Sequence, residues 1–166
     1  AYMAYGYARS TGKVGVFSVV PGPGVLNTMS ALCTAQGSNV PLVCLTSEIP
    51  TDFQGKGRRH LHEIRDQLGT LRSLIKWAEQ CDAPEAAPAL VNEAFKQSQS
   101  NRPGPVSLQV PWNVVGQTGD VILLDPEDLT RPAAQADEID AAADLIAGAS
   151  APLIYVGGGA LHAGAE

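Results

Sequence analysis

Charged residues are scarce in this chain of 166 residues, because Asp, Glu, Lys and Arg together make up only 17% of it. Such a low content is unusual for a free-standing soluble domain and indicates a surface that packs against a partner or a second domain. The formal net charge is −6. We therefore expect no nucleic-acid ligand, because a phosphate backbone attracts clustered Lys and Arg.

Long hydrophobic runs are also missing. No apolar stretch approaches the roughly 20 residues that a helix needs to cross a bilayer. The segment Ala1–Arg9 lacks the basic start of a secretory signal peptide. The first residue is not Met, which fits a chain cut from a longer protein. These observations predict a cytoplasmic protein without a membrane segment.

Cysteine is rare, and Cys33, Cys44 and Cys81 show no CxxC spacing. Cys33 and Cys44 lie inside apolar segments, where a free thiol behaves as a small hydrophobic side chain. We expect buried, reduced cysteines, which agrees with a cytoplasmic location.

Apolar residues are plentiful at 45%, enough for a packed core. Runs rich in β-branched residues predict buried strands over 14–20, 41–46, 105–110 and 151–156. Helical patterns predict helices over 27–36, 82–98 and 137–147. Residues 1–10 are expected to form the end of a helix, and 68–77 a short helix or an irregular segment. Strands that alternate with helices predict an α/β fold with a parallel sheet flanked by helices.

Capping residues and local composition indicate where helices and domains begin. Asp82 and Glu85 have the spacing of a capping box, and Asp137 is placed to cap the last helix. The mixed, proline-containing segment 116–135 predicts a linker between two domains. The first domain covers 1–115 and lacks its N-terminal part. The second covers 136–166 and is the truncated start of a Rossmann-like α/β domain.

A proline-glycine turn, Pro21-Gly22-Pro23-Gly24, follows the first predicted strand and precedes Asn27. Ligands of open parallel sheets bind beyond the carboxyl ends of the strands, where this turn, Thr46–Pro50 and Pro111–Asn113 are expected to emerge. The spacing matches neither a Walker loop nor a dinucleotide fingerprint. A rigid turn without a ligand therefore remains an equal alternative on pattern alone. Gly157-Gly158-Gly159 is weaker evidence for a nucleotide site.

The segment between Glu48 and His62 predicts a polar loop. His60 and His62 have a spacing that could chelate Zn²⁺, but no further Cys or His pair is near, so a solvated loop is the better interpretation. The basic residues Lys56, Arg58 and Arg59 either attract an anionic substrate or are plain surface charges.

Taken in order, four stretches resemble the thiamine-diphosphate enzymes that include acetolactate synthase, pyruvate oxidase, glyoxylate carboligase and oxalyl-CoA decarboxylase. They are Gly6-Tyr7-Ala8-Arg9 with Thr11-Gly12-Lys13, the turn Pro21–Gly24 with Asn27, Pro41-Leu42-Val43 with Thr46, and Arg102–Val106 leading to Val110-Pro111. The segment from Arg131 to Ala165, with Ala151–Gly159 (APLIYVGGG), is similar to the start of the central domain of this family.

The resemblance implies the pyrimidine-binding domain of a carboligase or decarboxylase that acts on a 2-keto acid. It assigns thiamine diphosphate to Pro21, Gly22, Pro23, Gly24 and Asn27. It also implies that the catalytic glutamate precedes Ala1, that Mg²⁺ is bound by another domain, and that the central domain holds FAD or ADP. The site of such enzymes forms across a homodimer or homotetramer interface, so this fragment is expected to be inactive alone.

Leu61-His62-Glu63 departs from acetolactate synthase, which has Phe-Gln-Glu here, so His62 is the candidate substrate-pocket residue and can transfer protons near neutral pH. The departure suggests a relative with a different donor or acceptor. Two alternatives stay open: an enzyme similar to oxalyl-CoA decarboxylase, and a non-catalytic nucleotide-binding α/β module.

Overall fold

The computed structural model describes the chain except for residues 128, 130–132 and 163–166. The chain divides into two compact units, Ala1–Thr130 and Arg131–Glu166. The dipeptide Arg131-Pro132 of the expected linker and the last four residues lie outside the described part. None of the described helices is long and apolar enough to cross a membrane.

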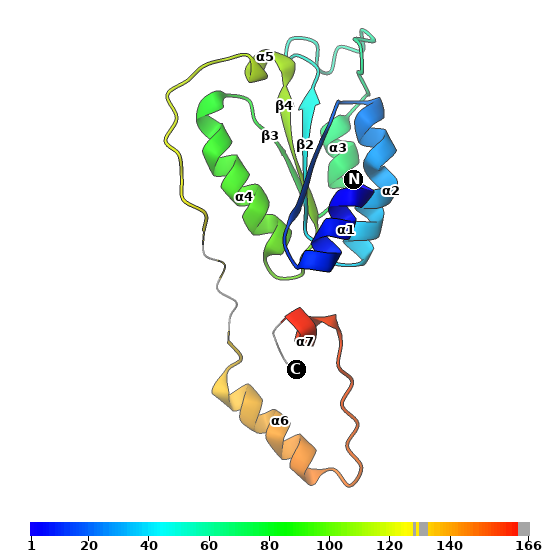
Figure 1. Ribbon diagram of the computed structural model, residues 1–166, viewed down its shortest axis with the longest axis vertical. Helices are drawn as coiled ribbons and strands as arrows, with labels where there is room; N and C mark the ends of the chain where they lie inside the picture. Colours follow the sequence, from blue (N-terminus) through cyan, green and yellow to red (C-terminus); the bar gives the residue numbers. More distant parts are fainter. Residues whose placement is uncertain (128, 130–132, 163–166) are drawn as a thin grey trace. The chain divides into compact units, whose positions relative to one another are not determined.

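The first unit is built on a four-stranded parallel sheet with the order β1-β2-β4-β3 (Figure 1). The strands are β1 (Gly15–Val19), β2 (Leu42–Glu48), β3 (Trp77–Gln80) and β4 (Pro105–Pro111). The helices are α1 (Tyr2–Thr11), α2 (Pro23–Gly37), α3 (Gln67–Arg72), the 3₁₀ turn η1 (Pro84–Ala86), α4 (Ala87–Gln99) and α5 (Trp112–Val115). The predicted α/β fold with a parallel sheet flanked by helices is confirmed.

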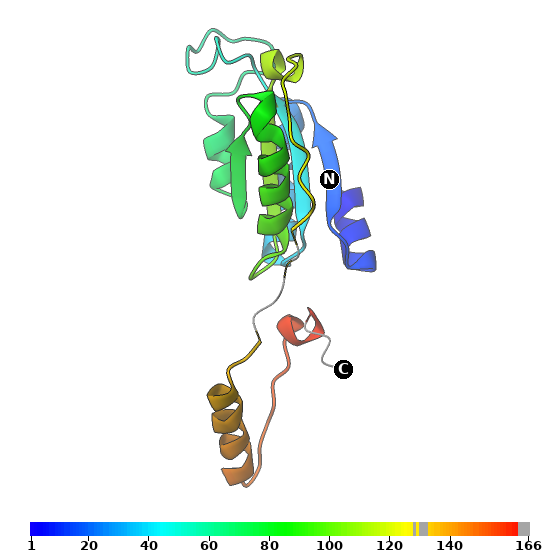
Figure 2. The same cartoon turned by 90° about the vertical axis from the view of Figure 1, so that its left-hand side faces the viewer.

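Helices cover both faces of this sheet (Figures 1 and 2). On one face, α1, α2 and α3 bury two clusters of side chains, Ala4, Ala8, Ala35, Val40 and Leu42 in the first and Val25, Leu32, Leu71, Ile75 and Ala78 in the second. On the other face, Ala94 of α4 packs against Val43 and Val106. The covering is uneven, because Val16 and Val20 at the β1 edge are 47% and 52% exposed.

Four local expectations were wrong. The first helix after β1 starts at Pro23 rather than Asn27, because Pro fits the first turn of a helix, where no N–H is needed. No strand was predicted at Trp77–Gln80, where β3 lies, although the short helix expected over 68–77 is present as α3. The run 14–20 is not buried on both faces, since β1 alternates between buried and exposed side chains. Cys33 is exposed, because it lies on the solvent side of α2.

The capping predictions also need correction. Helix α4 is entered through η1 and has no side-chain cap, and Asp82 instead accepts a hydrogen bond from the Gln80 amide at 2.6 Å. The second unit contains α6 (Ala136–Gly148), which is capped by Gln135 and Glu138 rather than by Asp137.

The second unit shows few of the features expected of a packed domain. Residues 151–156 form no strand, and α7 (Gly158–His162) begins within the glycine triplet. Ile139 and Ile146 of α6 are 56% and 49% exposed. A strand gains its stability from neighbouring strands, and the described part of this unit offers none for 151–156 to pair with.

Candidate functional site at the carboxyl edge of the sheet

Three segments meet at the carboxyl ends of the strands: the turn after β1, the loop after β2, and α5 after β4. Trp112 Nε1 donates to Ser47 Oγ at 2.9 Å, which connects α5 to the end of β2. Asn113 and Thr51 exchange two hydrogen bonds of 3.0 Å. These contacts bring the expected binding segments Thr46–Pro50 and Pro111–Asn113 together.

The turn after β1 depends on glycine at position 22. Gly22 has φ 59° and ψ −111°, a conformation that side chains disfavour. A Cβ at this position would lie 2.2 Å from the carbonyl oxygen of His62. The close approach therefore places the β2–α3 loop, with His62, directly against the proline-glycine turn.

The five residues predicted to bind the cofactor differ in accessibility. Pro21 and Gly22 are buried, Gly24 is half-buried, and Pro23 and Asn27 are exposed. Pro23 and Asn27 are four residues apart in α2 and thus lie on one face of the helix. Only this exposed face is available to a ligand, while Pro21 and Gly22 contribute through the shape of the turn.

A hollow of about 430 Å³ opens beside the turn at the same edge of the sheet. The ends of β1, β2 and β4 line it together with α5, through Ser18, Val19, Val20, Leu45, Thr46, Ser47, Val110 and Val115. Most of these side chains are apolar, as is usual for small-molecule sites.

His62 is brought into this site by an unusual backbone conformation, with φ 70°. Its ring lies edge-on to Trp112, with centroids 6.0 Å apart. Its Nδ1 is buried and has no hydrogen-bond partner in the described structure. A buried polar atom without a partner is costly unless a ligand or water supplies one.

Among the other residues of this loop, one histidine makes aromatic contacts and three basic residues are exposed. The ring centroid of His60 lies 4.7 Å from that of Phe53 and 6.1 Å from that of Trp112. Trp112, which connects both histidines, was missed from the sequence. Lys56, Arg58 and Arg59 are exposed. The described residues contain no group of three or more potential metal ligands.

Glu48 is a second residue that the sequence analysis missed. It ends β2 with only 6% of its surface exposed, and its Oε1 accepts a hydrogen bond from the N–H of Ile49 at 2.7 Å. Burial raises the pKa of this carboxyl, and the nearby carboxylates of Glu63 and Asp66 raise it further. In the sequence, the only sign of this site residue was a carboxylate at the end of a predicted buried strand.

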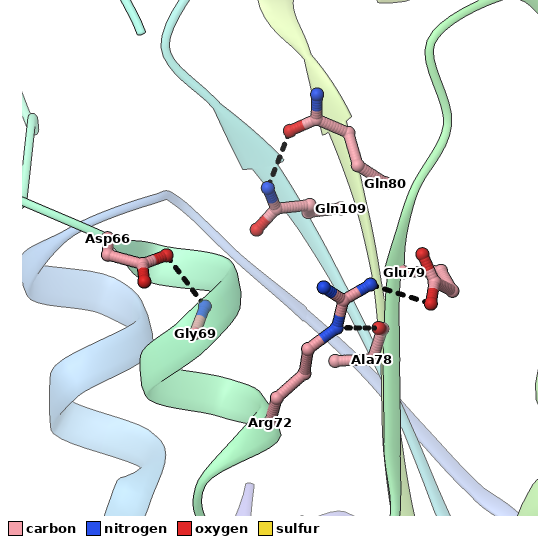
Figure 3. Close-up of polar contacts among 7 residues, drawn as sticks. All are labelled: Asp66, Gly69, Arg72, Ala78, Glu79, Gln80 and Gln109. Carbon is pink, nitrogen blue, oxygen red and sulfur yellow. Dashed lines mark hydrogen bonds and ion pairs between the residues drawn. The ribbon is translucent and has the colours of Figure 1, made fainter. Parts of the chain in front are cut away.

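A chain of glutamine amides runs behind the turn. Gln67 Oε1 accepts from the N–H of Gly22 at 2.7 Å, and Gln67 Nε2 donates to Gln109 Oε1 at 3.2 Å. Gln109 Nε2 in turn donates to Gln80 Oε1 at 2.6 Å (Figure 3). Gln67 and Gln109 are each 2% exposed. A lone Gln in a buried strand was the only hint of this chain in the sequence.

This chain is similar to several known proteins. Residues 1–70 match the family described as thiamine pyrophosphate enzyme, N-terminal TPP binding domain. Acetolactate synthase of Arthrospira platensis is 38% identical and is matched by 100% of this chain, and the mitochondrial acetolactate synthase catalytic subunit of Saccharomyces cerevisiae is 34% identical over 97% of it. A probable 2-ketoarginine decarboxylase, AruI, of Pseudomonas aeruginosa is 34% identical over 98%.

The chain spans 29%, 25% and 30% of the lengths of these three relatives, respectively. Two observations thus coincide: the parallel sheet with its proline-glycine turn, and the match of residues 1–70 to a TPP binding domain. Residues 1–70 are thus similar to the N-terminal TPP binding domain of thiamine pyrophosphate enzymes, and the whole chain is similar to part of acetolactate synthase.

Proposed function

We propose that this chain forms the pyrimidine side of the active site in a thiamine-diphosphate-dependent carboligase or decarboxylase that acts on a 2-keto acid. Residues 1–115 would form the pyrimidine-binding domain, 116–135 the linker and 136–166 the start of the next domain. The observation that carries the proposal is the exposed pair Pro23 and Asn27 at the start of α2, at the carboxyl edge of the sheet.

The residues present fit one side of a flat aminopyrimidine. The Pro23 ring offers an apolar surface, and the Asn27 amide can both donate and accept hydrogen bonds to polar ring atoms. Thiamine diphosphate held here would supply the nucleophilic carbon needed for chemistry at the keto carbon of the substrate. The proposal assigns the catalytic glutamate, the Mg²⁺ ligands and any FAD or ADP site to parts of the protein outside these residues.

His62 is proposed to contact the substrate. The half-buried imidazole of His62 can hydrogen-bond a substrate oxygen or transfer a proton to it. The exposed side chains of Val16 and Val20, together with the low charge content, support a site completed by a second subunit of a homodimer or homotetramer.

The test uses the full-length protein and measures the dissociation constant of thiamine diphosphate by quenching of tryptophan fluorescence. We expect Asn27→Ala to raise this constant about fivefold, the effect of one lost hydrogen bond. Ser30→Ala is the matched control, since Ser30 is exposed on the same helix. Unchanged binding in the Asn27 variant, or no binding by the wild type, contradicts the proposal.

A decarboxylase for a keto acid with a cationic side chain is a second candidate. The relative named as a 2-ketoarginine decarboxylase suggests it. The carboxyl groups of Glu48, Glu63 and Asp66 lie close enough to interact and would offer acceptors for a guanidinium group.

The two candidates predict different substrates and products. Comparison of kcat/KM for 2-ketoarginine and pyruvate, with carbon dioxide and acetolactate as products, separates them. Inhibition of keto-acid turnover by coenzyme A would favour an enzyme similar to oxalyl-CoA decarboxylase. Binding of ADP without turnover of any keto acid would favour the non-catalytic module.

A further inference from the structure

We infer that Gln67 is a positioning residue that holds the cofactor-binding turn in place through Gly22, an inference that rests on the proposed function. Its amide is fully engaged. The oxygen accepts from the N–H of Gly22 at 2.7 Å, and the nitrogen donates to the carbonyl oxygen of Ser47 at 3.0 Å and to Gln109 Oε1 at 3.2 Å. One side chain therefore connects the turn after β1 to the ends of β2 and β4.

The base of the Gln67 side chain is itself held firmly. Asp66 caps α3 by accepting from the N–H of Gly69 at 2.7 Å, and a Cβ at Gly69 would lie 2.0 Å from an Asp66 carboxylate oxygen (Figure 3). Arg72, at the other end of α3, binds the Ala78 carbonyl at 3.0 Å and Glu79 at 2.6 Å. The helix that carries Gln67 is thus attached to β3.

The orientation of the amides is determined by the two ends of the chain. The N–H of Gly22 can only donate, and the carboxylate of Asp82, which accepts from Gln80 Nε2 at 2.6 Å, can only accept. Rotating any of the three amides by 180° would place two oxygens or two N–H groups against each other. The chain therefore has one fully bonded arrangement, which fixes the atom that Gln67 presents to Gly22.

Loss of the Gln67 amide would leave the buried N–H of Gly22 without an acceptor. An unpaired buried N–H is costly, so the peptide would shift toward water or another acceptor. Pro23 follows Gly22 directly, and Asn27 lies one turn further along α2. A shift at Gly22 therefore changes the position of both residues proposed to contact the pyrimidine.

The experiment compares Gln67→Met with Ser107→Ala in the full-length protein. Methionine has a similar shape but cannot accept from Gly22. Ser107 is an equally buried control on β4, and its hydroxyl donates to the Cys44 carbonyl away from the turn. Two quantities are measured: the dissociation constant of thiamine diphosphate, and the amide hydrogen exchange of peptides that cover the turn in the cofactor-free protein.

We expect Gln67→Met to raise the dissociation constant about five- to tenfold and to speed exchange at the turn by a similar factor. At saturating cofactor, kcat should change less than about twofold, because Gln67 does not touch the reacting groups. Ser107→Ala should change neither quantity at the turn. Equal effects in both variants, or no effect in Gln67→Met, overturn the inference.

A second variant covers the case in which Gln67→Met fails to fold. Gln109→Met leaves the bonds of Gln67 to Gly22 and Ser47 but removes the acceptor of its second N–H, so smaller changes in the same direction are expected. Failure of the wild type to bind thiamine diphosphate refutes the proposed function alone. Unchanged exchange at the turn in the Gln67 and Gln109 variants refutes the positioning role.

Discussion

At the scale of single residues, the site is shaped by positions where a Cβ atom does not fit. Gly22 is the clearest case, because its positive φ and the contact with the His62 carbonyl exclude a Cβ independently. Gly24 is restricted as well, since a Cβ there would lie 2.7 Å from Val20 Cγ2. Both glycines serve the packing of the protein on itself, while Pro23 and Asn27 stay accessible.

Glu48 gives a pH-dependent prediction at the same scale. Its folded-state pKa is raised by burial, so the folded protein binds this proton more tightly than the unfolded chain. The stability from the protonated form is fully present below the ordinary Glu pKa and is lost as pH rises through the raised value. Glu48→Gln keeps an oxygen for the N–H of Ile49. We expect its melting temperature to exceed that of the wild type by a few degrees at pH 8.

The difference should disappear below about pH 4, where Glu48 is protonated in both states. Thermal unfolding across pH, with Asp52→Asn as an exposed control in the adjoining loop, checks the trend. A Glu48→Gln variant that melts below the wild type at pH 8 would contradict it.

At the scale of secondary-structure elements, the end of α4 is held by a residue from outside the helix. Lys76 Nζ donates to the carbonyl oxygens of Gln97 and Ser100, the latter at 2.6 Å. A cation at a helix C-terminus interacts favourably with the helix dipole and satisfies carbonyls that lack helical partners. The bond also connects α4 to the start of β3.

We expect Lys76→Met to reduce the local stability of the last turn of α4 by about 1 to 2 kcal/mol. Native-state hydrogen exchange of that turn measures the change. Lys56→Met, which replaces an exposed loop lysine, should leave exchange in α4 as it is. Equal protection of the turn in both variants would show that Lys76 does not stabilise it.

At the scale of the whole molecule, part of the predicted linker belongs to the first compact unit. Asn92 Nδ2 donates to the Asp125 carbonyl at 2.8 Å, and Lys96 pairs with Glu127 at 2.9 Å. Residues 125–127 thus lie against α4. Packing within the first unit decides which thiols are accessible.

Cys44 and Cys81 are buried and Cys33 is exposed. Burial raises the pKa of Cys44 from 9.0 to about 11 and raises that of Cys81. At pH 8 the thiolate fraction of Cys44 falls about a hundredfold. We expect alkylation mapped by mass spectrometry to label Cys33 first in the native protein and all three alike in urea. Labelling of Cys44 as fast as Cys33 in the native state would contradict this burial.

Much of the fold could be predicted from local patterns, and the exceptions have physical causes. The β-branched runs at β1, β2 and β4 marked three of the four strands. Strand β3 was missed because Trp77–Gln80 is short and half polar, and it is recognisable only through its pairing with β4. The segment 151–156 has the composition of a strand but no neighbour to pair with in the described structure.

By itself, the sequence determined the parallel α/β class, the proline-glycine turn and the family resemblance, because these depend on neighbouring residues. Only the tertiary structure decided that Gln67, 45 positions away, would bind Gly22, and that Trp112 would lie against His62. Such contacts depend on strand order and register, which bring distant residues to one edge of the sheet. Short-range patterns carry no information about which of them will meet.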